Sequence, residues 1–459
     1  MDQTHRRNLI LSGNMYKVIL TLALPIMVNN LIQTLYNLVD GVWVSRLGSV
    51  QFAAVSFVWP VLFLFVSIGI GLSIAGTSIL SQLVGASKFR EANRYATELV
   101  AISFVAGILF ALAGYLLSPY IVQMMGGRDE LLEFSTIYLR ISFLDIPFMF
   151  LFFNYNSIMS AQGNTMQPTI LSALSAIINI VLDPVLIFNF NLGVAGAAYA
   201  TLISKMVLCI MALFMLFIKP RLIKINFNGF KFDKKIIYDL VKVGIPSSIG
   251  QSGAALGFML LNIFIASYGT ATLAAFGMVN RVTGLIMQPA MGIGASLTSI
   301  VGMNIGNGML DRVKEGFKKS LFLTLGMSGF GLAAILIWNS DIVNFFIQSK
   351  DDPEVITQGI EYMKFIAFSM PLMGIFSIFQ GVFQGSGFTR YSMAMEIGRL
   401  WLVRIPMILL FKYLTDFGET GIWFSMSFSN LFICIYGYAI YKMNKWQRGI
   451  IGKVENTVS

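Results

Sequence analysis

Long apolar stretches, separated by short polar connections, follow one another along the whole chain. Each charge-free stretch reaches or exceeds the roughly 20 residues that a helix needs to cross a bilayer. Together with the segments around them, these stretches predict twelve membrane-spanning helices and no soluble domain. The predicted spans, with ends placed to within a few residues, are 16–44, 52–82, 94–117, 132–160, 166–190, 193–218, 237–268, 271–304, 313–338, 354–385, 390–413 and 419–443.

The first span carries polar side chains on one side of an otherwise apolar helix. Between Lys17 and Arg46 its only charged residue is Asp40. A carboxylate inside a membrane is costly and usually marks an ion pathway. The alternative is a buried polar seam that only joins helices. The polar residues that fall within an arc of roughly 100° on this helix are Asn29, Gln33, Tyr36, Asn37 and Asp40.

The second half of the chain repeats the first at an offset of 221 residues, which grows to 224 and then 225 further along. Two copies of a six-helix unit are therefore predicted, as domains 1–222 and 223–459. Because six is an even number, both copies keep one orientation and can enclose a central cleft, as in an alternating-access transporter. The predicted fold class is an all-α integral membrane protein with twelve transmembrane helices in two pseudo-symmetric six-helix lobes. Residues paired by the first offset include Pro25 with Pro246, Gly71 with Gly292 and Gly85 with Gly306.

The first copy carries Asp40, Asp145 and Asp183 at positions where the second copy has no acid. Asp40 lies on the first span, Asp145 lies on the fourth, and Asp183 follows Asn179 by one helical turn on the fifth. At the matching positions the second copy has Leu261, Ser369 and Met407. Since the copies share their backbone features but not these acids, the acids serve something other than the fold. We expect the ion chemistry in the N-terminal lobe.

Composition agrees with a membrane protein, since 56% of the residues are hydrophobic and 12% are charged, against about 25% charged in average soluble domains. The net charge of +10 could suggest nucleic acid. Its placement argues against that, because the basic residues gather on one side of the predicted membrane. With the N-terminus in the cytosol, the other side keeps only Arg46, Arg128, Lys350 and Lys412. We expect both termini in the cytosol, contact with anionic lipids, and no nucleic-acid partner.

No catalytic motif is recognisable in the chain. The single histidine, His5, lies before the first span, and Cys209 and Cys434 lie in separate apolar spans. This pattern offers neither a disulfide framework nor a zinc motif. We expect no enzyme activity and no cofactor besides a coupling ion.

The chain resembles the multidrug and toxic compound extrusion family, and within it the prokaryotic DNA-damage-inducible F branch. The resemblance rests on the twelve spans, the two six-helix copies, the repeated glycines at the connections, and Pro25 and Asp40 in the first span. It implies a cation or proton site in the N-terminal lobe, which can also be a Na⁺ site. The residues at the matching positions are Asp40, Asn179, Asp183 and Thr201.

Around this site the resemblance places supporting or substrate-lining side chains. They are Gln33, Tyr36, Tyr138 and Asn156, to which the polar stripe adds Asn37. The sodium-driven branch also has acids on the seventh and tenth spans, and 243–280 and 365–385 contain none here, so we expect no sodium site in the second lobe. The resemblance implies no role for Asp145. Glu396 and Arg399, three residues apart, are expected to form a structural ion pair.

The proposed site is also plausible on physical grounds. Two carboxylates in a poorly hydrated lobe disfavour double ionisation, so the pair can take up a proton. Asn, Thr and carboxylate oxygens are hard ligands that suit Na⁺ as well. An organic cation and the incoming ion that compete for one negative site would give exchange instead of leak. Pro25 removes a backbone hydrogen bond from the first span, and we expect it to act as a hinge.

The expected function is therefore antiport of organic cations or drugs against H⁺ or Na⁺, by a monomer in the cell membrane. One alternative is a flippase for lipids or lipid-linked oligosaccharides, which would hold a pyrophosphate on several buried cations. Another is a scaffold or receptor that transports nothing. A major facilitator transporter would have an Asp-Arg-x-Gly loop after its second span, which 85–94 lacks. The buried cations available to a flippase are Arg140, Lys205, Lys242, Arg281, Lys364, Arg399 and Arg404.

Overall fold

Every regular element in the described part of the chain is a helix. The computed structural model describes residues 3–218, 222–346 and 353–450. The elements of the first half are α1 (Gln3–Ser12), α2 (Met15–Ser45), α3 (Ser49–Gly85), α4 (Phe89–Met124), α5 (Asp129–Ala161), α6 (Met166–Pro184), the π-helical turn η1 (Val185–Asn189) and α7 (Gly193–Ile218). Those of the second half are α8 (Lys234–Ala266), α9 (Thr270–Gly306), α10 (Leu310–Phe346), α11 (Pro353–Gly385), α12 (Thr389–Ile397), the π-helical turn η2 (Gly398–Arg404), α13 (Ile405–Leu414), α14 (Gly418–Lys442) and the short 3₁₀-helix η3 (Lys445–Arg448).

The predicted membrane-spanning helices are confirmed. Among the described residues, eleven helical segments are long and apolar enough to cross a membrane. The twelfth predicted span, 390–413, is formed by α12, η2 and α13 in series. It fails the same criterion because it is broken into short pieces and contains buried arginines. The fold is thus an all-α membrane protein with twelve spans.

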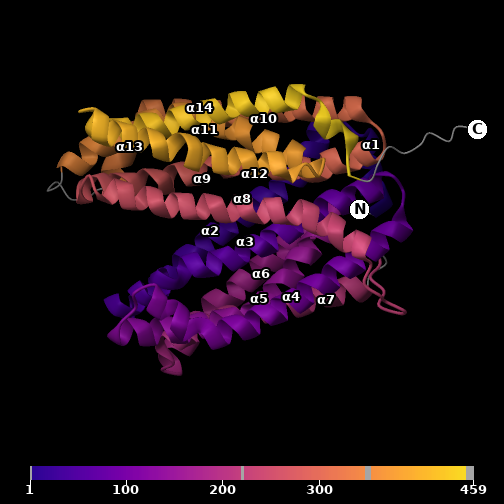
Figure 1. The fold of residues 1–459 in the computed structure, drawn as a ribbon, viewed down its shortest axis with the longest axis horizontal. Coiled ribbons are helices and arrows are strands. Elements are labelled where there is room, and N and C mark those ends of the chain that lie inside the picture. The colour runs from indigo at the N-terminus through magenta and orange to yellow at the C-terminus, as the bar shows by residue number, and fades with distance from the viewer. Residues whose placement is uncertain (1–2, 219–221, 347–352, 451–459) are drawn as a thin grey trace, which may run out of the picture.

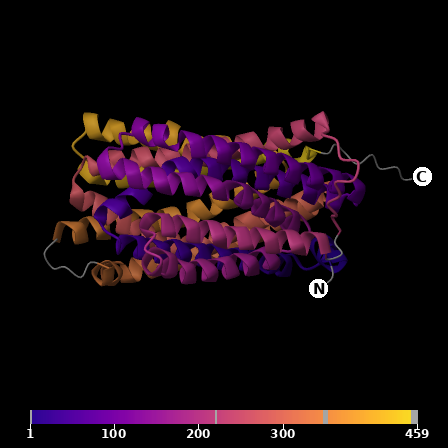
Figure 2. The same ribbon diagram turned by 90° about the horizontal axis from the view of Figure 1, so that it is seen from below.

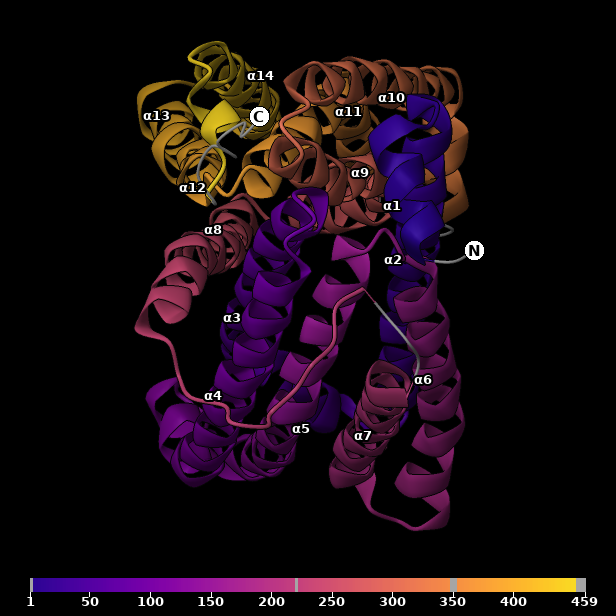
Figure 3. The same ribbon diagram turned by 90° about the vertical axis from the view of Figure 1, so that its right-hand side faces the viewer.

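The helices form two lobes, with α2–α7 in one and α8–α14 in the other (Figure 1). Viewed along the helices, the lobes meet where α2 and α3 of the first lie against α8 and α9 of the second (Figure 3). The first and the last described residues of the chain lie at the same end of the molecule (Figure 2). This is the arrangement expected when two six-helix units share one orientation.

The two lobes share a hydrophobic core only near the end that holds the termini. There Ile79 and Leu83 of α3 belong to the same buried cluster as Ile300 and Met303 of α9. Towards the opposite end the second lobe packs around its own cluster on α9, α11 and α14, and the first lobe packs around another on α3, α4 and α5. The lobes are therefore joined at one end and separate at the other.

Small residues bring the lobes together at the joined end. Gly385 accepts hydrogen bonds at its carbonyl oxygen from the Ser78 hydroxyl (3.2 Å) and the Gln82 side-chain amide (3.0 Å). Gly85 and Gly306 lie directly against backbone atoms of the opposite lobe. Glycines permit such close helix approach because they have no side chain. We call this junction of α3, α9 and the end of α11 the glycine clamp.

Helix α1 was not predicted, since the segment before the first span reads as a polar tail. In the structure Ile10 is 1% exposed and lies in the core shared by both lobes. The Arg7 guanidinium donates to the carbonyl oxygens of Val84 and Gly85, each over 2.9 Å. The apolar triplet at 9–11 was the sequence feature that marked this helix. It attaches the N-terminal segment to the glycine clamp.

The connection 222–233 joins the two lobes along the surface of α4. The Lys224 backbone N–H donates to Asn93 Oδ1 (2.7 Å), and the Asp233 backbone N–H donates to Glu98 Oε1 (2.7 Å). These bonds fix the segment to the first lobe. The domain boundary between 222 and 223 stays a prediction.

Candidate transport cavity and ion site

A cavity of about 1280 Å³ is walled mainly by α2, α3, α5, α6 and α7 of the first lobe, with a few residues of α9 and α11 from the second. It extends from Ser45 and Phe52 at the end remote from the termini to Thr298 and Gln384 beside the glycine clamp. Ordinary small-molecule sites occupy roughly 300–1,000 Å³. This cavity is larger, as a passage for bulky molecules needs to be.

The polar stripe of α2 faces this cavity, as the sequence predicts. A stripe of this kind avoids lipid because its polar atoms find water or protein partners in the cavity. Asp40 lies on the wall together with side chains from α5 and α7. The predicted site residues that line the cavity are Gln33, Tyr36, Asn37, Asp40, Tyr138, Asn156 and Thr201.

Asn179 and Asp183 lie behind the cavity wall and are both 0% exposed. In the amide orientation that satisfies both ends of Asn179, its nitrogen donates to Asp183 Oδ2 (2.9 Å). Its oxygen then accepts from the backbone N–H of Thr201 (3.1 Å). The Thr201 side chain shares a hydrogen bond of 3.2 Å with the Tyr36 hydroxyl. A continuous polar path therefore runs from Tyr36 on the cavity wall to Asp183 in the interior.

Asp40 on α2 and Asp183 on α6 belong to two helices that pack against each other. One carboxylate oxygen of each acid, Oδ1, is buried without a hydrogen-bond partner among the described residues. A buried charged oxygen without a donor is costly. Each acid thus has an unused acceptor that a proton or a cation can satisfy.

Asp145 and Lys205 form an ion pair that sequence reasoning did not find. The Lys205 ammonium donates to Asp145 Oδ2 over 2.7 Å, and both side chains line the large cavity. The sequence does place Lys205 one turn after Thr201, on the same face of α7. It could not show that Asp145 of α5 faces it, because this contact depends on how the helices pack.

Pro25 lies inside α2, which runs without interruption from Met15 to Ser45. Two hydroxyl groups of the α6 region support the backbone of α2 around the proline. Thr165 donates to the Leu22 carbonyl oxygen (3.0 Å), and Thr169 donates to that of Pro25 itself (2.9 Å). These bonds join the weak point of α2 to the helix that carries Asn179 and Asp183. The hinge role of Pro25 stays a prediction.

Two six-helix lobes with a large cavity lined by polar side chains are the architecture of a membrane transporter. A family model described as MatE matches the chain twice, at residues 25–185 and 246–410. The chain therefore belongs to the MatE family of multidrug efflux transporters and is not an enzyme. Members of this family depend on a coupling ion and need no cofactor. The prediction of the DNA-damage-inducible F branch is not decided by this match.

Known relatives agree over nearly the full length. The chain is 27% identical to "Probable multidrug resistance protein YpnP" of Bacillus subtilis, over 95% of this chain and 96% of that protein. It is 25% identical to "Multidrug export protein MepA" of Staphylococcus haemolyticus, over 90% of each. A solved structure described as "Crystal structure of MATE in complex with MaL6" superposes with a TM-score of 0.90 at 26% identity, over 95% of this chain and 97% of that chain.

Proposed function

We propose that the protein exports organic cations in exchange for protons, with Asp40, Asn179, Asp183 and Thr201 as the coupling site. One observation carries the proposal. Asp40 lies on the cavity wall, while Asp183, on the adjoining helix α6, is fully buried behind the wall. A substrate can therefore reach the first acid, and a proton can neutralise the second.

The exchange follows from competition for this negative charge. An organic cation in the cavity is held by ionised Asp40. Protonation of the acid pair removes the charge, so the cation loses its main electrostatic partner and leaves. Because Tyr36, Thr201 and Asn179 connect the wall to Asp183, a change of charge at Asp183 also alters the hydrogen bonds of α2. The same site thus binds either the substrate or the coupling ion.

The hydrogen bonding of Asn179 favours a proton over Na⁺ as the coupling ion. Na⁺ requires several oxygen ligands around it. The Asn179 amide oxygen already accepts from Thr201, and the amide nitrogen faces Asp183. This leaves the free Oδ1 atoms of the two acids, which a proton can use without any rearrangement. A sodium ion would require the Asn179 amide to turn.

Aromatic side chains of the cavity suit bulky organic cations. Ring faces attract cations, and this attraction strengthens where water is excluded. The multidrug names of the relatives point to small-molecule drugs as substrates. The aromatic residues that line the cavity include Tyr36, Phe52, Trp59, Phe63, Tyr138, Phe148, Phe152 and Phe153.

The protein is proposed to act as a monomer in the cell membrane, with both termini in the cytosol and basic residues near anionic lipids. In that orientation the glycine clamp closes the cytosolic end, and the cavity faces outwards. A membrane potential of 100 mV acting on one charge is worth about 2.3 kcal/mol. This energy supports a substrate gradient of roughly 50-fold.

The test is uptake of tetraphenylphosphonium into proteoliposomes with an imposed gradient of protons or of sodium. A proton gradient without sodium should drive accumulation, and a sodium gradient at equal pH should not. Accumulation driven by sodium would show that the coupling ion is Na⁺ and would leave the proposed site residues unchanged. Accumulation that neither gradient drives, in liposomes shown to contain folded protein, would contradict the proposed function.

A further inference from the structure

A second cavity of about 520 Å³ lies on the other side of α2 and is walled mainly by the C-terminal lobe. It shares Asn30, Gln33 and Asn37 of α2 with the large cavity. The two cavities are therefore neighbours along the polar stripe. Nothing in the exchange mechanism above uses this second space.

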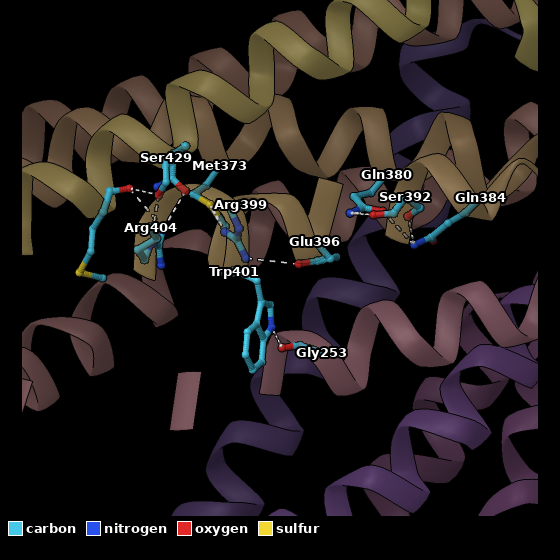
Figure 4. Close-up of polar contacts among 12 residues, drawn as sticks. Gly253, Met373, Gln380, Gln384, Ser392, Glu396, Arg399, Trp401, Arg404 and Ser429 are labelled. Atoms are coloured by element: carbon cyan, nitrogen blue, oxygen red, sulfur yellow. Dashed lines mark hydrogen bonds and ion pairs between the residues drawn. The ribbon is translucent and has the colours of Figure 1, made fainter. Parts of the chain in front are cut away.

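Two buried arginines line the second cavity. Arg399 is 4% exposed and Arg404 is 2% exposed, and both belong to η2. Figure 4 shows them next to each other on this turn. Insertions of π-helix into a helix occur frequently at functional sites. Here the π-helical turn carries both guanidinium groups.

The repeat places Arg399 at a position that corresponds to the ion-site helix of the other lobe. At an offset of 224 residues, Arg399 corresponds to Ser175 on the face of α6 that also carries Asn179 and Asp183. The helix face that presents Asp183 in the first lobe thus presents Arg399 in the second. The charged residues that line the large cavity are Asp40, Asp145, Lys205 and Arg281, whereas those that line the second cavity are the two arginines.

The positive charge of η2 is only partly neutralised. Arg399 pairs with Glu396 at 3.3 Å, as the sequence predicts. Arg404 donates from Nε to the Ser429 hydroxyl (2.9 Å), and its Nη2 donates to the Met426 carbonyl oxygen (3.2 Å) and Asn430 Oδ1 (3.0 Å). These partners are neutral, and within the described residues no carboxylate forms an ion pair with Arg404. Of the two guanidinium groups, only that of Arg399 has a carboxylate partner in the described structure.

Arg399 has hydrogen-bonding capacity to spare. Its Nη1 points at the thioether sulfur of Met373 (2.8 Å), which is a weak acceptor. Its Nε is buried without a hydrogen-bond partner in the described structure. The guanidinium lies over the ring of Phe376, 4.7 Å from the centroid. A planar, unsatisfied guanidinium of this kind is suited to bind a carboxylate or phosphate in bidentate geometry.

The remaining wall can adapt to an apolar ligand. Methionine side chains are flexible and polarisable, so they adjust to ligands of different shape. The polar residues Asn30, Gln33 and Asn37 border both cavities, so they lie between the arginines of η2 and the wall that carries Asp40. The methionines that line the second cavity are Met287, Met291, Met370, Met373 and Met426.

We infer that the second cavity binds the anionic group of an amphipathic ligand, with Arg399 and Arg404 as its binding residues. The ligand class is an aromatic amphiphile with a carboxylate, sulfonate or phosphate. A zwitterion can place its anionic group at η2 and its cationic ring system in the large cavity, beside the α2 stripe. The transporter then accepts zwitterionic molecules besides cations. This binding does not require the proton exchange proposed above.

The test compares two dyes that differ only at the anionic group: tetramethylrhodamine, which has a free carboxylate, and its methyl ester, which has none. Equilibrium binding to purified protein is measured by fluorescence polarisation in a non-ionic detergent. Arg404→Gln and Arg399→Gln should each weaken binding of the free acid by about tenfold or more, since each removes a charge-assisted hydrogen bond. Binding of the ester should stay within about twofold in both variants.

Two further variants guard against loss of folding. Arg390→Gln removes an exposed arginine of α12 and should change neither affinity. Glu396→Gln keeps both arginines and removes their carboxylate, so it should tighten binding of the free acid several-fold. Equal loss of both dyes in the arginine variants, or an unchanged affinity for the acid in Glu396→Gln, would overturn the inference. Failure of ion-driven transport alone would leave it standing.

The source of the anion is decided by repeating the binding in lipid nanodiscs. If phosphatidylglycerol displaces the free acid and phosphatidylcholine does not, the anionic group that fills the cavity in the membrane is a lipid head group. If neither lipid displaces it, the ligand is a soluble amphiphile. Both results support an anion site at η2. Displacement by phosphatidylglycerol that persists in Arg404→Gln would contradict it.

Discussion

Gly85 at the end of α3 and Gly306 at the end of α9 pack reciprocally across the two lobes. A β-carbon on Gly85 would collide with the backbone carbonyl of Met303, and one on Gly306 would collide with that of Gln82. Since the obstructing atoms belong to the backbone, no rotation of a side chain can relieve the collision. Close approach of the lobes at this end therefore requires glycine at both positions.

Replacing Gly85 by valine should open the glycine clamp. The reporter is a cysteine in place of the fully buried Ser78, in a background in which Cys209 and Cys434 are alanine. Labelling by a membrane-impermeant maleimide should become at least about tenfold faster in Gly85→Val, because the closed arrangement is disfavoured by more than about 1.4 kcal/mol.

The matched control for this experiment is Gly326→Val on α10, where a β-carbon would meet no atom within 4 Å. It adds the same side chain and should leave the labelling rate unchanged. Unchanged labelling in Gly85→Val as well would show that the close approach of α3 and α9 is not what closes this end.

The Asp145–Lys205 ion pair should add little net stability to the fold. Loss of one partner should nevertheless be costly, because it leaves the charge of the other partner unpaired. Lys205→Met leaves the Asp145 carboxylate, 8% exposed, without its cation, and this should lower stability by about 3 kcal/mol. The double variant Asp145→Asn/Lys205→Met removes both charges and should recover most of the loss. Thermal unfolding in detergent measures all four forms of this double-mutant cycle. A double variant as unstable as the sum of the singles would show that the two side chains act independently.

Pro25→Ala should lower exchange strongly while leaving equilibrium substrate binding at fixed pH nearly unchanged. Alanine restores the missing backbone donor, so α2 becomes stiffer at the point that Thr165 and Thr169 support. The measurement is the initial rate of exchange across a proton gradient, together with affinity in detergent. Pro246→Ala, in the lobe that lacks Asp40 and Asp183, is the matched control and should have less effect. Exchange at the wild-type rate in Pro25→Ala would remove helix bending from the coupling step.

Hydrophobic patterning was sufficient to predict the spans, because each membrane helix is marked by its own length and polarity. It missed α1, since Arg7 and Ile10 only find their partners once α3 and α9 are in place. It also missed η1 and η2. A π-helical turn adds no change in polarity, so periodicity along 166–190 or 390–413 does not reveal it.

Those features of the candidate site that lie on a single helix could be predicted from the sequence. The stripe of α2 and the spacing of Asn179 and Asp183 are visible in the sequence, and the structure brings both to Thr201. The partner of Asp145 and the second cavity were not visible. Each depends on side chains from helices far apart in the chain, which one sequence does not pair. The separation of Asp40 on the wall from Asp183 behind it is likewise a result of packing.

Uphill efflux by Asp40→Asn and Asp183→Asn in proteoliposomes tests the central claim most directly. Each substitution keeps the shape of the side chain and removes an acid, so protein yield and thermal stability should stay near wild type. Both variants should lose accumulation of tetraphenylphosphonium driven by a proton gradient, while Asp145→Ser, which copies Ser369 of the second lobe, should retain part of it. Wild-type accumulation per folded molecule in either Asp40→Asn or Asp183→Asn would contradict the proposed coupling site.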